Sequence, residues 1–207
     1  MSNEKSSDFW DLVDSCLEKL DLKLIEAKSQ GVLIAEQNPL KFAASFIAAM
    51  DRKVPIILSN YRWGDSEWDS FNREFSPAVT FGLRGAPKVN SPVFKEKDQG
   101  SILIPTGGTS GDRLRFAIHR WESLEAQSLM VQGFLKVKAI NSICCLPLFH
   151  VSGLIQVIRA IVSQGQILFC HLNDLEKASE AIAIKDFCVS LVPTQLSRLF
   201  YRDAIFS

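Results

Sequence analysis

The sequence lacks a charge excess, a long apolar run and a secretory leader, and each absence excludes a class of protein. Lys and Arg number 23 and Asp and Glu number 23, so the basic excess of a general nucleic-acid binder is missing. No apolar stretch reaches the roughly 18 residues that a membrane span needs. Residues 1–8 are polar and carry no apolar signal core. We therefore expect a cytoplasmic protein that binds no nucleic acid and has no membrane span.

The cysteines also lack a recognisable framework. They number five, an odd count, and none forms a C-x-x-C pair. This argues against a disulfide scaffold and against a zinc site, so we expect no metal ligands. Cys144, Cys145, Cys170 and Cys188 lie in apolar runs. The sequence predicts buried, reduced thiols.

What the sequence does contain is the composition of a globular core, with 47% hydrophobic residues in a chain of 207. From residue 121 on, predicted helices and strands alternate with short connections, which is typical of a parallel sheet covered by helices. We expect an α/β fold with a mixed, largely parallel sheet layered with helices. The predicted helices are 9–20, 39–50, 64–75, 121–137, 151–163, 174–184 and a last one from 193 on; the predicted strands are 54–58, 78–81, 101–105, 113–119, 141–146, 165–171 and 187–192.

Two helix starts and one internal linker follow from local signals. Asp8 is the expected N-cap of the first helix, and Asn38 that of the second, with Pro39 at its first position. Residues 82–100 are rich in Gly, Pro, Asn, Ser and Lys, and we expect a linker loop there. The predicted organisation is an α/β region over residues 1–81, that linker, and a second α/β region over 101–207.

The segment Thr106-Gly107-Gly108-Thr109-Ser110-Gly111 is the most informative stretch. It joins two predicted strands, and its glycines let backbone N–H groups approach a ligand closely. Such N–H groups form a concave anion site, and hydroxyls add donors. Arg113 and Arg115 supply positive charge. The loop is suited to nucleotide phosphates, although an ordinary hairpin turn is the alternative.

Two common phosphate motifs do not fit this loop. A Walker A loop needs Lys after its last glycine, and here Gly111 is followed by Asp112. The G-x-G-x-x-G spacing of dinucleotide-binding folds is also absent.

The loop resembles the phosphate-binding loop of acyl-adenylate-forming enzymes, Thr-Ser-Gly-Thr-Thr-Gly-x-Pro-Lys-Gly. The lysine of that pattern is missing, because Leu114 stands at its place, and Arg113 or Arg115 can supply the charge instead. Residues 146–154, Leu-Pro-Leu-Phe-His-Val-Ser-Gly-Leu, resemble the family's Leu-Pro-Leu-Phe-His-x-x-Gly-Leu segment. Residues 192–199 resemble its Val-Pro-Thr-x-Leu-x-x-Leu segment.

The resemblance implies the front part of the family's large N-terminal domain and a reaction in two steps. A carboxylic acid reacts with ATP and Mg²⁺ to give an acyl-adenylate, and coenzyme A then displaces AMP. His150 is the implied catalytic residue, between nucleotide and acid. Ser152 and Gly153 begin the next helix, whose free N–H groups can bind the acid's carboxylate together with His150; helix capping and close packing are the alternative role of these two residues. The implied phosphate contacts are Thr106, Gly107, Gly108, Thr109, Ser110, Gly111 and Arg115.

Within the family, residues 57–68 resemble cyanobacterial-type 2-succinylbenzoate–CoA ligases. This implies 2-succinylbenzoate as the acid, on the route to menaquinone or phylloquinone. The family's adenine, ribose and Mg²⁺ contacts and its C-terminal lid normally follow Ser207, so we expect a fragment that is inactive alone. Two alternatives stay open: a non-catalytic nucleotide- or phosphate-binding module, and a structural or partner-binding domain.

Overall fold

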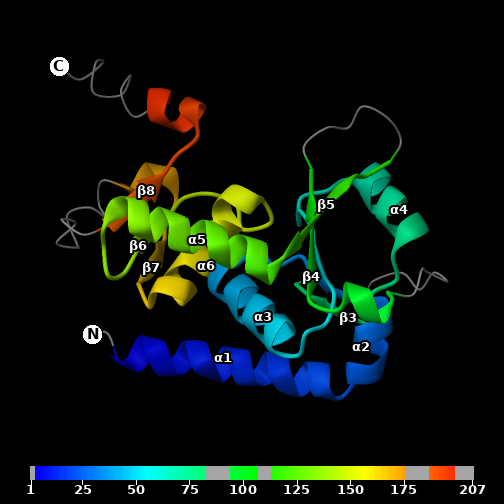
Figure 1. Ribbon diagram of the computed structural model, residues 1–207. Coiled ribbons are helices and arrows are strands. Elements are labelled where there is room, and N and C mark those ends of the chain that lie inside the picture. The colour runs from blue at the N-terminus through cyan, green and yellow to red at the C-terminus, as the bar shows by residue number, and fades with distance from the viewer. Residues whose placement is uncertain (1–2, 83–93, 107–112, 176–186, 199–207) are drawn as a thin grey trace. The chain divides into compact units, whose positions relative to one another are not determined.

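The structure is a computed structural model that describes residues 3–82, 94–106, 113–175 and 187–198 (Figure 1). The chain divides into two compact units, Met1–Ser123 and Leu124–Ser207, which we call the N-terminal and the C-terminal unit. Each unit carries its own sheet. The expected α/β class, a largely parallel sheet layered with helices, is confirmed.

The N-terminal sheet has five strands in the order β3-β1-β2-β4-β5. The first four are parallel, and β5 runs antiparallel to β4. Every residue of β1, β2 and β4 is buried. Parallel strands covered on both faces read as such continuous apolar runs. The strands are β1 Val32–Ile34, β2 Ile56–Leu58, β3 Val79–Phe81, β4 Ser101–Pro105 and β5 Phe116–Arg120.

The helices of this unit precede or connect its parallel strands along the chain. They are α1 Asn3–Asp21, α2 Leu24–Gln30, α3 Pro39–Asp51, α4 Asp65–Glu74 and the short 3₁₀ helix η1 Glu96–Asp98. The predicted cap of α3 is confirmed, because Asn38 Oδ1 accepts the N–H groups of Leu40 at 2.9 Å and Lys41 at 3.2 Å. The predicted cap at Asp8 is wrong: α1 begins at Asn3, so Asp8 lies inside the helix.

Two elements, α2 and β1, are absent from the sequence prediction, although β1 lies between β3 and β2 inside the sheet. The segment predicted as a linker, 82–100, connects β3 with β4 of that same sheet, and the compact unit extends to Ser123. The predicted division of the chain at 82–100 stays a prediction.

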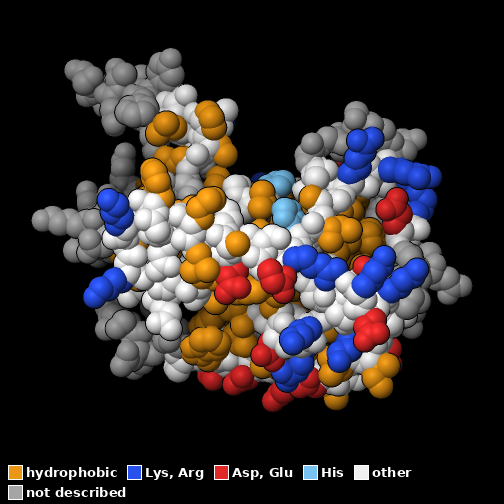
Figure 2. Space-filling model, viewed as in Figure 1, with side chains coloured by type: hydrophobic (Ala, Val, Ile, Leu, Met, Phe, Trp, Pro, Cys, Tyr) orange, Lys and Arg blue, Asp and Glu red, His pale blue; other side chains and the backbone are white. Residues whose placement is uncertain are grey.

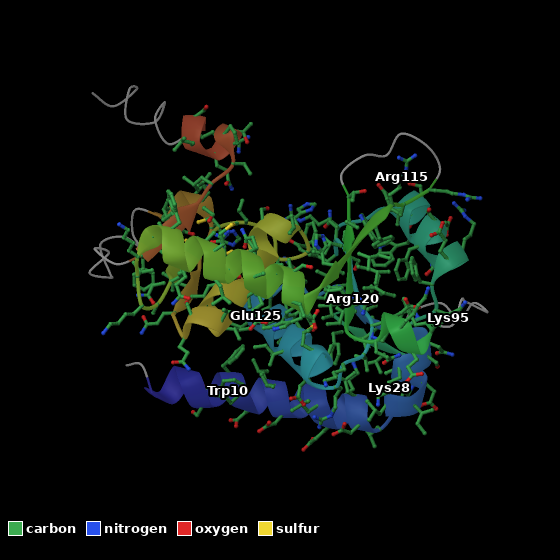
Figure 3. All side chains as sticks on the ribbon, in the orientation of Figure 1. Trp10, Lys28, Lys95, Arg115, Arg120 and Glu125 are labelled. Carbon is green, nitrogen blue, oxygen red and sulfur yellow. The ribbon has the colours of Figure 1, made fainter. Side chains whose placement is uncertain are left out.

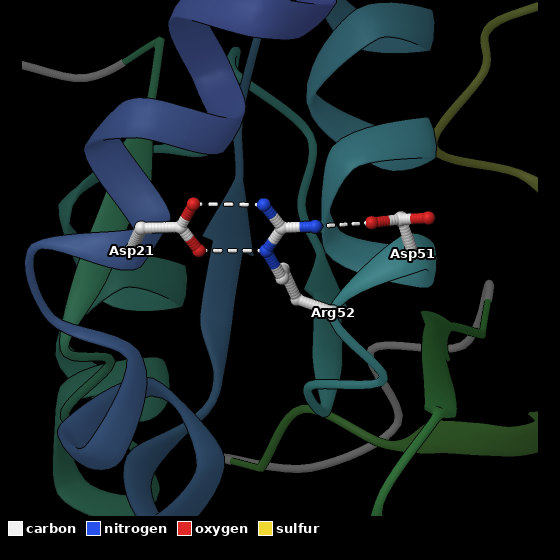
Figure 4. A network of polar contacts seen from close by, with 3 residues as sticks. All are labelled: Asp21, Asp51 and Arg52. Carbon is white, nitrogen blue, oxygen red and sulfur yellow. Dashed lines mark hydrogen bonds and ion pairs between the residues drawn. The ribbon is translucent and has the colours of Figure 1, made fainter.

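One ion-pair network joins the ends of α1 and α3, which lie side by side (Figures 1 and 4). Arg52 Nε donates to Asp21 Oδ1 at 2.6 Å and Arg52 Nη2 to Asp21 Oδ2 at 2.7 Å, while Arg52 Nη1 contacts Asp51. This fork-shaped pairing lowers the pKa of the Asp21 carboxyl, chiefly through the hydrogen bond from Arg52. It fixes the C-terminal end of α1 against the end of α3.

The C-terminal unit carries a parallel sheet of three strands in the order β7-β6-β8. Its helix α6 is apolar almost all round and largely buried, as its sequence predicted. The elements, of which α5 begins just before the unit, are α5 Trp121–Leu135, β6 Asn141–Cys144, α6 Val151–Ser163, β7 Ile167–Phe169, the 3₁₀ helix η2 Leu172–Asp174 and β8 Phe187–Ser190. Residues 193–198 are helical, as expected, and most of the helix predicted at 174–184 lies outside the described residues.

Two absences apply to the described residues. No helix there has the length and apolar character of a membrane span. Nor does the described part of the chain bring three His, Cys, Asp or Glu side chains together in a way that could hold a metal ion.

Candidate functional site

The glycine-rich segment lies between two strands, as the sequence predicted. The structure describes the residues on either side of this segment, where it joins β4 and leads to β5. Pro105 pairs with Phe116 at the last position of the β4–β5 ladder. One residue further, Thr106 N–H donates to the Arg115 carbonyl at 2.9 Å, and Thr106 Oγ1 donates to the same oxygen at 3.2 Å. The predicted phosphate contacts Gly107, Gly108, Thr109, Ser110 and Gly111 lie outside the described residues.

The two hydrogen bonds of Thr106 bear on its predicted role. Its amide and its hydroxyl both donate a hydrogen bond to the Arg115 carbonyl oxygen. A hydroxyl has one hydrogen to donate but two acceptor lone pairs, so it must rotate away from the carbonyl to donate to a phosphate. Thr106 therefore closes the hairpin, and its contact with phosphate stays a prediction.

Leu114, at the position of the missing lysine, anchors the second arm of the hairpin. Its N–H donates to Ser70 Oγ of α4 at 3.1 Å. Its side chain packs against a buried cluster formed by Leu33, Ile57, Phe71 and Leu103. This anchor was not foreseen, because Ser70 and Leu114 are 44 residues apart in the chain.

The two arginines beside Leu114 have the opposite environment. Arg113 and Arg115 are exposed, whereas Leu114 is half-buried. Leu114 packs inward against the buried cluster, while the two arginines on either side of it are exposed to solvent. Figure 3 shows Arg115 at the end of the β4–β5 hairpin, and Figure 2 shows Lys and Arg side chains gathered on the visible face of the same unit.

An aromatic cluster supports the start of β5. The Phe116 ring lies 6.4 Å from the Trp63 ring and 5.3 Å from the Phe75 ring, edge to face in both pairs. Trp63 also contacts Trp68 edge to face at 5.1 Å. Such pairs add about 0.5–1.5 kcal/mol each beyond the area they bury. The cluster holds α4 and the hairpin together as one body.

The second set of predicted site residues lies in the C-terminal unit, at the start of α6. His150 is the N-cap of α6, and its carbonyl accepts the N–H groups of Gly153 at 3.1 Å and Leu154 at 3.0 Å. The His150 ring lies 4.5 Å from the Phe149 ring. Partial burial lowers the pKa of His150. The imidazole is therefore mainly neutral at pH 7, where it donates one hydrogen bond and accepts another.

The first turn of α6 brings Ser152 and Gly153 next to His150, as the resemblance implied. A Cβ placed on Gly153 would lie 2.2 Å from the Pro147 carbonyl oxygen and 2.7 Å from its carbon. Only glycine lets the helix lie this close to the segment before it. Its N–H already donates to His150, so the structure gives Gly153 a packing reason, and its contact with a carboxylate stays a prediction.

A further polar group below this turn was not foreseen. Gln156 is fully buried, and its Nε2 donates to the Ser152 carbonyl at 3.1 Å. Its Oε1 has no hydrogen-bond partner among the described residues. In the sequence, Gln156 is the one amide side chain within the apolar run 151–163. The apolar pattern predicts a helix there, but it does not indicate that this amide is buried.

Comparisons with known proteins identify the fold. No family model matches the sequence, and no curated protein matches it. Among solved structures, the o-succinylbenzoate CoA synthetase MenE from Bacillus subtilis, in complex with its acyl-adenylate intermediate, is similar with a TM-score of 0.72 and 15% identity; the match covers 94% of this chain and 57% of that chain.

Two further structures agree. MenE in complex with ATP and magnesium ion has a TM-score of 0.72 and 15% identity, over 93% of this chain and 45% of that chain. ATP-bound MatB from Rhodopseudomonas palustris has a TM-score of 0.69 and 17% identity, over 91% and 44%. The chain thus spans about half the length of the structures that it matches. It has the fold of the N-terminal part of acyl-adenylate-forming enzymes.

Proposed function

We propose that this chain is the phosphate- and acid-binding part of an AMP-forming acid–CoA ligase of the cytoplasm. The proposed substrates are ATP with Mg²⁺, coenzyme A and 2-succinylbenzoate, and the proposed product is the CoA thioester used for menaquinone or phylloquinone. The shared fold with MenE and MatB supports the ligase class. The three motifs also support the ligase class, and the resemblance of the segment 57–68 supports 2-succinylbenzoate as the acid.

The observation that carries the proposal is the burial of residues 113–115, which follow the glycine-rich segment: the middle residue is half-buried and its two neighbours are exposed. Leu114 is fixed inward by Ser70 and the buried cluster, so Arg113 and Arg115 stand exposed beside the glycine-rich segment. In the first reaction step a carboxylate approaches a triphosphate, and both are negative. Fixed basic side chains and N–H donors offset this repulsion without reorganising during the reaction. We assign this role to Arg115 and to the segment from Thr106 to Gly111.

The first turn of α6 supplies the proposed contact for the acid. Neutral His150 can donate a hydrogen bond to the carboxylate without adding a positive charge. Ser152 lies in the same turn, at the end of the helix that favours negative charge. Gly153 serves this arrangement by letting the turn lie against Pro147. The described residues contain no cluster of side chains suited to Mg²⁺.

A second function is favoured by one observation. The lysine of the resembled motif is replaced by Leu114, whose side chain carries no charge and packs against the buried cluster. A phosphate-binding module without catalysis fits this replacement. The two functions differ in whether the chain also binds the acid.

Two calorimetric titrations test the proposal. Pyrophosphate should bind, and Arg115→Gln should weaken it about tenfold to a hundredfold, since hydrogen bonds to charged groups are worth about 1.5–3 kcal/mol. Lys138→Gln is the matched control, because it removes the same charge from an exposed site in the other unit and should leave the affinity unchanged. Absence of pyrophosphate binding would leave a structural domain.

The second titration uses 2-succinylbenzoate. His150→Ala should weaken its binding, and His171→Ala, which removes another exposed histidine of the same unit, should not. Binding of pyrophosphate without any binding of the acid would favour the phosphate module over the ligase.

A further inference from the structure

Two cysteines stand side by side at the carboxyl edge of the C-terminal sheet. Cys145 directly follows β6, and Cys170 directly follows β7. The ladder pairs Cys144 with Phe169, and the N–H of Cys170 donates to the Cys144 carbonyl at 3.3 Å. Cys145 and Cys170 are therefore the next neighbours across two adjacent parallel strands. Their Sγ atoms lie 3.3 Å apart.

The backbone at this position suits a disulfide. Neighbouring strands lie about 4.7–4.9 Å apart, and bridged cysteines usually have Cα atoms about 4.4–6.8 Å apart. The two sulfur atoms are already in contact. Closing the bond therefore needs side-chain rotation rather than a shift of either strand.

The other cysteines lack this arrangement. Cys144 is buried, and its Sγ donates to the Leu146 carbonyl at 3.5 Å. Cys188 is exposed on β8, which pairs with the edge of β6 that faces away from β7. It lies in register with Ser142 of β6. Cys16 belongs to the N-terminal unit, where its Sγ contacts Ser45 Oγ at 3.6 Å. The expectation of buried thiols thus holds for Cys144 and is wrong for Cys188.

We propose that Cys145 and Cys170 form a reversible dithiol site that a small-molecule disulfide oxidises to an intramolecular disulfide. One cysteine thiolate attacks a sulfur of the reagent, forms a mixed disulfide and releases one reagent thiolate. The second cysteine thiolate attacks the mixed disulfide at the protein sulfur and releases the other. Two protein thiols are thus oxidised, the reagent is reduced to two thiols, and these take up both protons.

The surroundings set the speed of this reaction. Burial, followed by the hydrogen bond with Cys170, raises the pKa of Cys145, and the nearby Cys144 acts in the same direction. Because the thiolate is the nucleophile, the bond should form slowly at neutral pH and faster in mildly alkaline solution. Both cysteines are only half-buried, so a small reagent can reach them.

The crosslink would act on the loop that carries the candidate acid site. Residues 146–149 begin immediately after Cys145 and lead to His150, the N-cap of α6. A covalent bond between the ends of β6 and β7 removes freedom at the start of this loop. The proposal itself stands on the cysteine geometry and does not depend on the ligase function.

Peptide mapping tests the proposal on the whole chain. The folded protein is incubated with oxidised glutathione in mildly alkaline buffer, blocked with N-ethylmaleimide and digested with trypsin. Monomeric protein should yield the peptides 139–159 and 160–177 joined by a disulfide, which dithiothreitol separates. A glutathione adduct that stays on Cys145 or Cys170 without crosslinking overturns the proposal.

Three serine variants locate the bond. Cys145→Ser and Cys170→Ser should each abolish the crosslink, and Cys144→Ser, one residue away on the same peptide, should retain it. Circular dichroism shows whether each variant is folded. Because Cys144 and Cys145 share a peptide, retention of the crosslink in folded Cys145→Ser would assign it to Cys144 and refute the pairing inferred here. Crosslinking only in denaturant would refute it as well.

Discussion

Gly153→Ala offers a direct test of how the candidate acid site is built. The added Cβ would lie 2.2 Å from the Pro147 carbonyl oxygen, where real Cβ atoms essentially never come closer than 3.0 Å. The difference between these distances, 0.8 Å, must come from the backbone of residues 146–147 or from the helix, because no flexible side chain is in the way. Overpacking of this kind costs about 1–3 kcal/mol.

Alanine also stabilises a helix relative to glycine, and a control position in the structure separates this gain from the cost of the clash. Replacing glycine inside a helix gains about 0.5–1 kcal/mol. Gly133 of α5 is the matched control, since a Cβ there meets nothing within 4 Å. We expect Gly133→Ala to raise the free energy of unfolding by that gain and Gly153→Ala to lower it by about 1 kcal/mol, the mid-range cost of overpacking less the mid-range gain.

Urea unfolding followed by far-ultraviolet circular dichroism measures both variants, and hydrogen exchange of the α6 amides shows whether the loss is local. The opposite signs are the essential result, because the chemical change is the same in both. Equal stabilisation by the two alanines would refute the close approach of α6 to Pro147. It would also reopen a direct ligand contact as the reason for glycine at 153.

Two further predictions concern the anchors of the candidate sites. Ser70→Ala removes the acceptor of the Leu114 N–H, so we expect urea unfolding to show a loss of about 1 kcal/mol and calorimetry to show weaker pyrophosphate binding; unchanged values for both would contradict the anchor. The pKa of His150 is lowered in the folded state, so its contribution to stability is full above the ordinary value of 6.5 and is lost as the pH falls through the folded pKa. NMR titration should therefore show a lowered pKa for the His150 imidazole, whose signal is identified by its absence in His150→Gln, and a His150 pKa at or above 6.5 would contradict this reasoning.

The elements that the sequence predicted well are those with local signals. Asn38 and Pro39 fix the start of α3, and the apolar run 151–163 defines α6. The strand 101–105 is continuous and bounded by Gly100 and Thr106, and the structure keeps these bounds. In each case the chain carries its own cap, period or boundary residue.

β1 shows why other elements were missed. Its three residues, Val32–Ile34, are too few to display a period, and α2 before it has only seven. Yet β1 hydrogen-bonds to both β2 and β3, and Leu33 belongs to the buried cluster under the hairpin. Its identity as a strand comes from partners that lie more than twenty residues away along the chain, so no local pattern reveals it.

The difference between local signals and contacts across the chain also decides which parts of the candidate sites the sequence could predict. Thr106 and Arg115 flank one loop, and His150, Ser152 and Gly153 share one turn, so sequence neighbours suffice to group them. The Ser70–Leu114 bond spans 44 residues and the Cys145–Cys170 contact spans 25, and both depend on which elements become neighbours. Because β6 and β7 are adjacent and in register, two cysteines that spacing alone presents as unrelated thiols become a pair. The residues of the two candidate sites can thus be grouped as local motifs, while the contacts that support them and the neighbouring Cys145–Cys170 pair follow only from the topology.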